Sequence, residues 1–335
     1  MSQPLDISVV IPMLNEQGCV RELLERLLAV LDGVAAPFEI VVVDDGSSDD
    51  TPEIVRAVAR ERPEVRMLRM ATNFGQEAAV QAGMLRSSGR WVIQLDGDLQ
   101  HPPEEIPKLL ALRSEGYEII YGTRQKRKDP WHRVAASKAM VFIMRNILGI
   151  VLPDDITTFR VIDGDLARMI ARLPEKKKFF SALAGWAGAH AHSVPVKHSA
   201  RQAGHTKYNL SKLISHMFDL MVGFSVRPLR IIGGAGALFA LVGIAYGVVR
   251  IVQKLIGVPV NIGYTSIFSA VVIMGGLNLV ALSVIGEYVG RLFIQAQDRP
   301  LYRVVEAMGF ADASTSSPAG ELGSVAAPAE PGSSS

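Results

Sequence analysis

The chain has 335 residues, of which 49% are hydrophobic and 20% charged, and its formal net charge is +2; the mean hydropathy is +0.24. This composition excludes a disordered or fibrous protein and is too apolar for a purely soluble globule, so part of the chain should lie in lipid. The small net charge argues against a nucleic-acid partner, and the single cysteine, Cys19, excludes an intrachain disulfide and a zinc cluster built on thiolates.

Short apolar runs of strand length alternate with helical patterns from Ile7 to about Gly122. The runs cover residues 7–11, 39–43, 65–70, 91–95 and 118–121. Between the first two runs, a stripe with the spacing of one helix face contains Val20, Leu23, Leu24, Leu27, Leu28 and Leu31. The alternation predicts an α/β domain with a mainly parallel sheet and helices on both faces.

Hydropathy rises sharply near Ser225. Residues 231–249 and 265–286 contain no charged side chain, and each run is close to the ~20 residues that cross a hydrocarbon core of ~30 Å. A buried core helix is the alternative interpretation, but runs of this length are unusual there, and they contain glycines suited to close helix contact: Gly233, Gly234, Gly236, Gly275 and Gly276. The sequence therefore predicts a transmembrane hairpin within residues 226–305.

Basic residues are more frequent outside the predicted hairpin than in the connection between its spans. The flanks contain Arg227, Arg230, Arg291, Arg299 and Arg303, whereas the connection contains Arg250 and Lys254. The positive-inside rule then places both ends of the hairpin, and the domain of residues 1–225, in the cytoplasm. The N-terminus lacks the basic start and cleavage site of a secretory signal. We therefore expect a multi-pass protein of the cytoplasmic (inner) membrane, and a disordered tail over residues 311–335.

Polar residues follow three predicted strands at their carboxyl ends, where open α/β sheets bind ligands. These segments are residues 12–16 (PMLNE), 44–49 (DDGSSD) and 96–100 (DGDLQ). The carboxylates of Asp96 and Asp98 repel each other unless a cation neutralises them, and hard oxygen ligands favour Mg²⁺ or Mn²⁺ over zinc. The pair therefore predicts a divalent metal site at these strand ends.

Other α/β classes use similar acids. A receiver domain groups strand-end aspartates, but it is not expected to continue into a membrane hairpin. A haloacid-dehalogenase-type phosphatase needs D-x-D-x-T, and this chain has Gln100 at the threonine position. No G-x-G-x-x-G follows the first strand, which disfavours a dinucleotide oxidoreductase.

Several segments together resemble family 2 glycosyltransferases of the polyprenyl-phosphate type. They are residues 11–12 with 15–16, residues 43–47 with Asp49, residues 73–75, residues 96–100 with 102–104, and Arg201 with Gly204 and residues 207–208. The resemblance runs in the same order over about residues 5–305 and includes the hairpin. It implies a GT-A catalytic domain with juxtamembrane helices over residues 1–225. It also implies inverting transfer of a sugar from a UDP- or GDP-linked donor to undecaprenyl or dolichyl phosphate.

The resemblance also implies roles for individual residues. The nucleotide-sugar pocket would contain Pro12, Asn15, Glu16, Asp44, Asp45 and Asp96. The metal on the diphosphate would be held by Asp96, Asp98 and Gln100. The donor or acceptor phosphate would contact Arg124, Arg133, Ser137, Arg201 and Lys207. The catalytic residues would be Asp98 and Asp155, the latter as base or as a group that orients the acceptor. Thr157, Thr158 and Thr206 depart from the family pattern.

The chemistry explains why such residues are needed. A leaving nucleoside diphosphate gathers negative charge as the sugar bond breaks, and a divalent cation stabilises that charge as a Lewis acid. A lipid monophosphate, with a second pKa near ~6, is already largely dianionic at pH 7, so a general base is dispensable. For the basic segment 124–133 two interpretations stay open: contact with anionic lipid headgroups, or a solvated surface loop. Residues 133–148 and 209–223 form interfacial helices or pack within the domain.

Three functional hypotheses stay open at this point. The first is a membrane enzyme that makes a polyprenyl-phosphate sugar for cell-envelope glycans, whose product a flippase and a further glycosyltransferase would use. The second is a processive polysaccharide synthase, which usually has a Q-x-x-R-W motif and more spans. The third is a non-catalytic nucleotide-sugar sensor, against which Asp96, Asp98, Gln100, Arg124 and Arg201 argue. The span glycines permit homo-oligomer packing as well as packing within one hairpin.

Overall fold

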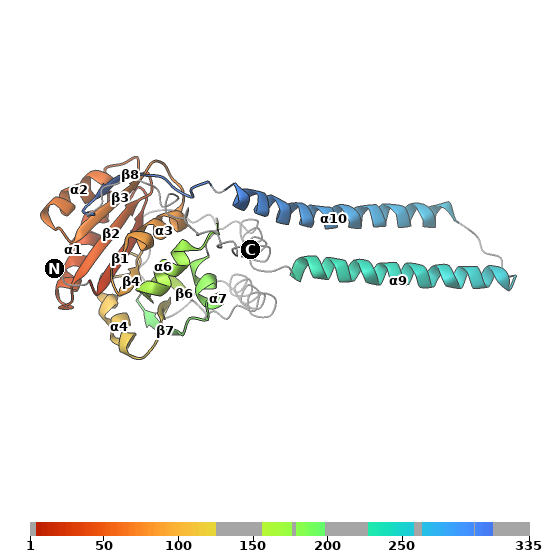
Figure 1. Cartoon of the computed structure of the whole chain (residues 1–335), viewed down its shortest axis with the longest axis horizontal. Helices are drawn as coiled ribbons and strands as arrows, with labels where there is room; N and C mark the ends of the chain where they lie inside the picture. The colour runs from red at the N-terminus through yellow and green to blue at the C-terminus, as the bar shows by residue number, and fades with distance from the viewer. Residues whose placement is uncertain are drawn as a thin grey trace, which may run out of the picture. The chain divides into compact units, whose positions relative to one another are not determined.

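The computed structural model describes residues 5–124, 156–175, 179–197, 227–257, 263–297 and 299–310. Within these residues the chain forms two compact units. One contains a sheet with the helices that pack on it, and the other contains two long helices (Figure 1). The predicted interfacial segments 133–148 and 209–223 and the tail 311–335 lie outside the described residues.

The first half of the sheet unit alternates strands and helices, as the sequence predicts. Its elements are β1 (Ile7–Met13), α1 (Val20–Asp32), β2 (Phe38–Asp44), α2 (Thr51–Glu61), β3 (Val65–Met70), α3 (Gln76–Arg86) and β4 (Trp91–Gln94). The four strands are parallel, in the order β4-β1-β2-β3. The carboxyl ends of β4, β1 and β2 therefore lie side by side at one rim of the sheet.

The second half adds short helices and antiparallel strand pairs. Its elements are η1 (Pro103–Glu105), α4 (Ile106–Leu110), η2 (Ala111–Ser114), β5 (Ile119–Arg124), β6 (Ile156–Asp163), α6 (Gly164–Arg172), α7 (Phe180–Trp186) and β7 (Ala191–Val196). Strand β6 is antiparallel to β4 and β5, and β7 is parallel to β5. With β8 (Val304–Met308), the sheet has the order β7-β5-β6-β4-β1-β2-β3-β8. The fold is the mostly parallel α/β sheet that the sequence predicts.

Apolar residues fill the interfaces between the sheet and its helices. All six residues of the stripe predicted for α1 are buried, in one cluster with Val9, Ile11, Ile40 and Val42 of the strands. On the opposite face, α3 packs so closely on β1 that a Cβ added at Gly83 would lie 2.4 Å from Val10 Cγ1. Burial of one leucine side chain contributes about 1.5–3 kcal/mol, so α1 and α3 fix the strands whose ends carry the polar loops.

The second unit consists of α9 (Arg227–Leu255) and α10 (Tyr264–Ala296). Both predicted spans lie inside these helices. The windows Ile232–Val249, with mean hydropathy 2.0, and Ile273–Ala296, with 1.5, are long and apolar enough to cross a membrane, and neither is buried in protein. Helix α10 continues past the predicted second span, where Arg291 Nε donates to Glu287 Oε1 at 2.8 Å. The limits of the spans and domains stay predictions.

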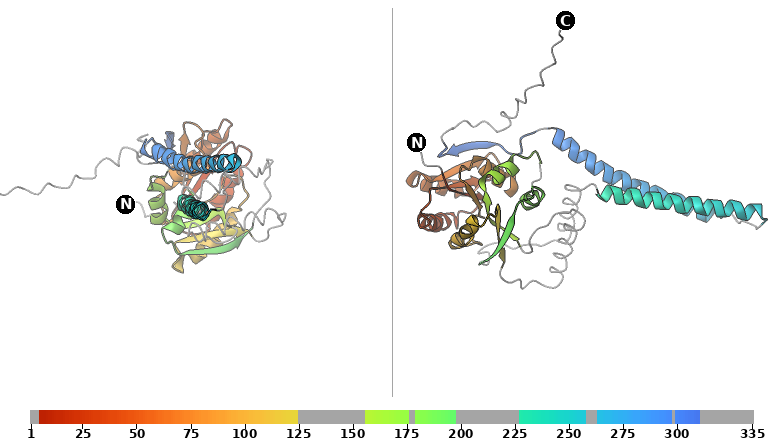
Figure 2. Two further views of the ribbon diagram at one scale, coloured as in Figure 1. Left: turned by 90° about the vertical axis from the view of Figure 1, so that its right-hand side faces the viewer. Right: turned by 60° about the horizontal axis from the view of Figure 1, so that its bottom comes forward.

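Strand β8 is an element that the sequence analysis does not predict. It pairs antiparallel with β3 at the side edge of the sheet (Figure 2). Just before it, Tyr302 is buried, and the carbonyl oxygen of Arg303 accepts a hydrogen bond from Ala71 N at 2.9 Å. The residues that follow α10 in the sequence thus belong to the sheet unit.

Candidate active site

Three loops, residues 14–19, 45–50 and 95–102, follow β1, β2 and β4; we call them the rim loops. Hydrogen bonds join the first two: Asn15 N donates to Ser47 Oγ at 2.9 Å, and Ser48 N donates to Asn15 Oδ1 at 2.9 Å. Asn15 has a φ of 56° and Leu99, in the third loop, has 57°. Residues with a Cβ rarely adopt this left-handed backbone conformation. Such backbone strain, about 1–3 kcal/mol per residue, clusters at functional sites.

Asp44 ends β2 and is completely buried. Its Oδ1 accepts a hydrogen bond from Ser47 N at 3.2 Å, which closes the turn that carries Ser47 toward Asn15. Its Oδ2 lies 3.4 Å from Arg69 Nε in β3 and has no hydrogen-bond partner in the described part of the chain. A buried carboxylate oxygen of this kind is costly unless a charge or a ligand compensates it.

Asp45 is also buried and holds a different part of the chain. Its Oδ1 accepts from Phe74 N at 2.8 Å and its Oδ2 from Gly75 N at 2.9 Å. Burial raises the pKa of Asp45, against the two backbone hydrogen bonds, which lower it. Gly46 has a φ of 77°, and a Cβ there would lie 2.6 Å from the Thr72 carbonyl carbon. The Asp-Gly pair thus allows the segment before α3 to approach the second rim loop.

Asp96 and Asp98 occupy the third rim loop and are partly exposed. Asp96 Oδ1 accepts from Gln76 Nε2 at 2.8 Å, and Asp96 Oδ2 accepts from the Thr158 hydroxyl. Asp98 Oδ1 accepts from Gln100 N at 3.2 Å. The pKa of Asp96 is raised, chiefly by loss of hydration and further by the negative charge of Asp98. The negative charge of Asp98 thus disfavours the ionised form of Asp96, and a cation bound there would remove this cost.

Cys19 is the last residue of the first rim loop, and its side chain contacts the third rim loop. Its Sγ is 3.2 Å from the Gly97 carbonyl oxygen and 3.3 Å from Glu16 Oε2. Burial, together with the nearby carboxylates, raises the pKa of Cys19 to about 12. The side chain is therefore a neutral thiol that bridges the two loops.

A buried arginine, Arg160, interacts electrostatically with Asp96. Arg160 in β6 donates to Gln94 Oε1 at 3.0 Å and to Ser181 Oγ at 2.7 Å, and its guanidinium stacks over the Phe180 ring at 4.8 Å. Burial lowers the pKa of Arg160, while the charge of Asp96 is among the causes that raise it. This network supports the part of the rim where β4 and β6 meet.

Glu77, in the first turn of α3, shares this environment. Its side chain is accessible to solvent, yet loss of hydration raises its pKa, and the negative charge of Asp96 acts in the same direction. Sequence reasoning missed Gln76, Glu77 and Arg160. Thr158 is singled out in the sequence only because it departs from the family pattern.

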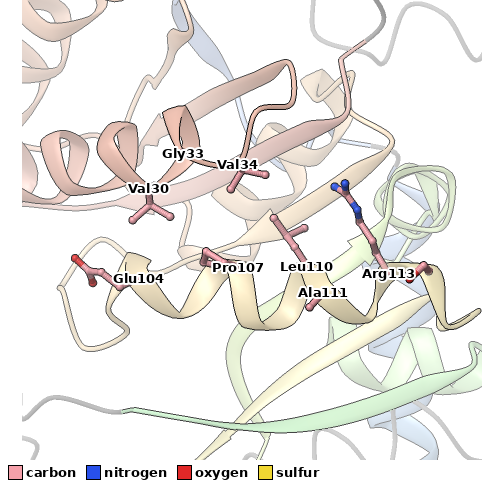
Figure 3. Close-up of a pocket in the computed structure, with 9 residues that line it drawn as sticks. Val30, Gly33, Val34, Glu104, Pro107, Leu110, Ala111 and Arg113 are labelled. Carbon is pink, nitrogen blue, oxygen red and sulfur yellow. The ribbon is translucent and has the colours of Figure 1, made fainter.

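A pocket of about 540 Å³ lies elsewhere, between the end of α1 and the α4–η2 segment (Figure 3). Its lining includes Val30, Val34, Pro107, Leu110 and Arg113. Because α1 begins beside the rim loops and runs away from them, this pocket lies at the far end of the helix. None of the predicted site residues lines it.

The structure brings together most of the predicted site residues that it describes. Pro12 is in β1, and the three rim loops with the end of β2 contain Asn15, Glu16, Asp44, Asp45, Asp96, Asp98 and Gln100. Arg124 is the last residue of β5, and its side chain lies outside the described part. Also outside the described residues are Arg133, Ser137, Asp155, Arg201 and Lys207. The roles of all these residues stay predictions.

Comparison with known families and proteins gives concordant matches. The model of glycosyl transferase family 2 matches residues 8–169, and the model of the GtrB C-terminal hairpin matches residues 227–292. The chain is 36% identical over 300 residues to the undecaprenyl-phosphate 4-deoxy-4-formamido-L-arabinose transferase of Edwardsiella ictaluri, covering 88% of this chain and 92% of that protein.

Two further matches are a curated protein and a solved structure. An uncharacterized glycosyltransferase of Bacillus subtilis is 34% identical over 310 residues, covering 92% of this chain and 96% of that protein. Among solved structures, glucosyl-3-phosphoglycerate synthase of Mycobacterium tuberculosis is similar at a TM-score of 0.49 with 19% identity, covering 65% of this chain and 78% of the other.

Proposed function

We infer the reaction from the premise that this chain belongs to glycosyl transferase family 2 and is a glycosyltransferase. We propose that it transfers a sugar from a nucleoside diphosphate sugar to a polyprenyl phosphate, with inversion at the anomeric carbon. One observation carries the proposal: a single chain combines a rim of clustered carboxylates with two long helices whose apolar side chains are exposed. A water-soluble donor fits the first feature, and a lipid acceptor fits the second.

The rim offers a nucleotide site. The backbone and side chain of Asn15 are fixed by Ser47 and Ser48, and the buried Oδ2 of Asp44 lacks a hydrogen-bond donor in the described chain. In our proposal these loops bind the nucleoside, with Pro12 and Glu16 in the same wall. Both oxygens of Asp45 already accept backbone hydrogen bonds, so Asp45 shapes the pocket by holding residues 74–75.

The third rim loop fits a hard divalent cation. Asp96 and Asp98 supply carboxylate oxygens and Gln100 can add an amide oxygen, which are ligands that Mg²⁺ and Mn²⁺ prefer. In the described residues no group of three or more His, Cys, Asp and Glu side chains could hold a metal ion by itself. Mg²⁺ commonly uses one or two carboxylates and takes further oxygens from substrate phosphates. When bound, the cation would act as a Lewis acid on the leaving diphosphate.

The remaining residues then act on the substrates. Gln76 and Thr158 orient Asp96, and Arg160 supplies positive charge behind it. In our proposal Arg124, Arg133, Ser137, Arg201 and Lys207 bind phosphate, because guanidinium and ammonium groups donate strongly to phosphate oxygens. Asp155 orients the acceptor or serves as base. The acceptor oxygen attacks opposite the leaving diphosphate, which inverts the anomeric carbon.

The helical hairpin would hold the enzyme in the membrane that contains the lipid acceptor. We propose that α9 and α10 span the inner membrane, with the domain of residues 1–225 on the cytoplasmic side. The hairpin then lies within residues 226–305, and the described residues from 299 onward belong to the sheet unit. The acceptor in the name of the Edwardsiella ictaluri relative is undecaprenyl phosphate, and we propose the same chemical class here. The lipid-linked sugar would leave the cytoplasmic face through a flippase and serve a further glycosyltransferase.

The test is a panel of UDP- and GDP-sugars offered to the purified full-length protein with undecaprenyl phosphate and Mn²⁺. One labelled sugar is expected to enter the lipid phase as a monosaccharide phosphodiester. Growth of a polymer instead would identify a processive synthase. Nucleotide binding without transfer for every donor and acceptor would identify a sensor, and either result would overturn the proposal.

A further inference from the structure

Three charged side chains stand opposite one another in adjacent strands at the side edge of the sheet. The strand register pairs Asp44 of β2 with Arg69 of β3, and Arg69 with Glu306 of β8. Residues directly opposite each other in neighbouring strands point to the same face and interact. A negative, a positive and a negative group therefore form one row, which we call the charge row, from the end of β2 to the strand that follows α10.

Arg69 lies between the two carboxylates in the register and forms an ion pair with Asp44. Its Nε lies 3.4 Å from Asp44 Oδ2, a contact that leaves this oxygen without a hydrogen bond in the described chain. On the other side, the charge of Arg69 is among the causes that lower the pKa of Glu306. Arg69 thus has a carboxylate of opposite charge on each side in the strand register.

Glu306 itself is held firmly. Arg56 of α2 donates through Nε to Glu306 Oε1 at 2.9 Å and through a terminal nitrogen to Oε2 at 2.9 Å, the paired geometry that best fixes a carboxylate. Arg56 also donates to Glu53 Oε1 at 2.7 Å. The carboxylate of Glu306 therefore has a defined position in front of Arg69, although it belongs to a strand distant in sequence.

The other end of the charge row reaches the rim loops. Asp44 Oδ1 accepts from Ser47 N, Ser47 Oγ accepts from Asn15 N, and these bonds set the shape of the first two loops. If Arg69 were released by Glu306, its guanidinium would form a full charge-assisted bond with Asp44 Oδ2. The carboxylate would then rotate, and the 3.2 Å bond from Ser47 N would be lost.

We propose that Glu306 is a positioning residue for nucleotide binding, because it balances Arg69 against Asp44 and thereby keeps the second rim loop in its binding shape. The proposal rests on the proposed function, in which this loop binds the nucleotide. It gives the strand after the hairpin a part in donor binding, through charge and not through direct contact with the substrate.

Two variants separate this role from simple tethering of β8. Glu306→Gln and Arg56→Gln break the same ion pair, so both should lower the Tm by similar amounts. Only Glu306→Gln removes the charge that faces Arg69. We expect Glu306→Gln to weaken nucleoside diphosphate binding about fivefold, the upper range of a cross-strand charge pair. Arg56→Gln leaves the charge of Glu306 in the row and loosens only its position, so it should weaken binding clearly less.

The measurement is calorimetric titration of the full-length protein in detergent with UDP and with GDP in the presence of Mn²⁺, together with donor KM and kcat. Glu306→Gln should raise KM with kcat nearly unchanged, and Glu306→Asp, which keeps the charge, should recover part of the affinity. Equal weakening by Glu306→Gln and Arg56→Gln, or none by Glu306→Gln, overturns the inference. A wild-type protein that binds neither nucleotide overturns the proposed function instead.

Discussion

The sheet unit and the helical unit depart from ordinary burial in opposite ways. In the sheet unit, charged groups are inside: Asp44 is 0% exposed, Asp45 3% and Arg160 4%. In the helical unit, large apolar side chains are outside, with Ile244 64% and Leu282 62% exposed. Soluble proteins rarely bury charges without partners or expose continuous apolar surface.

The difference shows what each unit lacks. Asp45 and Arg160 have hydrogen bonds within the protein, whereas Asp44 Oδ2, next to the rim loops, has no hydrogen bond in the described chain and only the charge of Arg69 at 3.4 Å. The exposed apolar side chains have no such compensation in the described structure, and hydrocarbon is the medium that compensates them. These two features are the grounds on which we propose a polar ligand at the rim loops and a bilayer around the helices.

The largest expected effect is a loss of catalytic rate after a substitution in the third rim loop. Asp98→Asn keeps the size of the side chain but removes the charge that would neutralise a cation, so kcat for sugar transfer should fall about a thousandfold. Asp50→Asn is the matched control, because Asp50 is exposed in the neighbouring loop and its side chain does not cap α2. Initial rates of both variants at saturating donor and metal measure the difference. Equal activity of the two variants would remove Asp98 from the mechanism.

A second change tests the helical unit. Ile244→Lys places a charge within the first span, where insertion should become less favourable by about 3 kcal/mol. Met169→Lys is the control, since Met169 is an exposed apolar residue of the sheet unit, 39% exposed. Insertion efficiency in microsomal membranes, read from engineered glycosylation sites, should fall only for Ile244→Lys. An unchanged efficiency would mean that α9 does not enter the bilayer.

A third, smaller effect concerns Thr158. Thr158→Val removes the hydroxyl that donates to Asp96, which should lower kcat/KM about tenfold, the usual range for a hydrogen bond to a charged group. Thr157→Val removes a hydroxyl that donates to the Gly122 carbonyl oxygen at 2.9 Å and should leave kcat/KM close to wild type. If both variants lose the same activity, the hydroxyl acts on the fold and not on Asp96.

The smallest effect is a pH dependence of stability at the side edge. The hydrogen bond from Arg56 lowers the pKa of Glu306, so its contribution is present above the unfolded pKa of about 4.3 and is lost as the pH falls through the folded pKa. For a partly exposed pair it should stay below about 1 kcal/mol. The Tm difference between wild type and Glu306→Gln should therefore be measurable at pH 7 and shrink as the pH falls below about 4.3. A difference that is undiminished at pH 3 would show that the pair's charge is irrelevant.

The sequence predicts the features that depend on local pattern. The stripe from Val20 to Leu31 and the strand runs were sufficient to predict α1 and the parallel strands, because apolar periodicity is a local property. The meeting of the rim loops follows from parallel pairing, since carboxyl ends of neighbouring parallel strands share one rim. The contacts of Thr158 and Arg160 could not be predicted, because they join side chains from segments far apart in the chain.

Strand β8 shows the same limit. Its five residues, Val304–Met308, show no regular alternation of apolar and polar side chains, and they follow a long apolar helix whose hydropathy dominates the region. The pairing with β3 depends on contacts such as Arg56 with Glu306, which no local pattern reveals. The bridging position of Cys19 between two rim loops is likewise a product of tertiary structure.

The most direct test of the central claim is to locate manganese by anomalous scattering in crystals of the full-length protein grown with a nucleoside diphosphate sugar. The account predicts one Mn²⁺ bound to Asp96 and Asp98 and to the diphosphate oxygens, with the nucleoside against the first two rim loops. A donor bound in those loops without metal at the two aspartates, or a metal bound elsewhere, would contradict it.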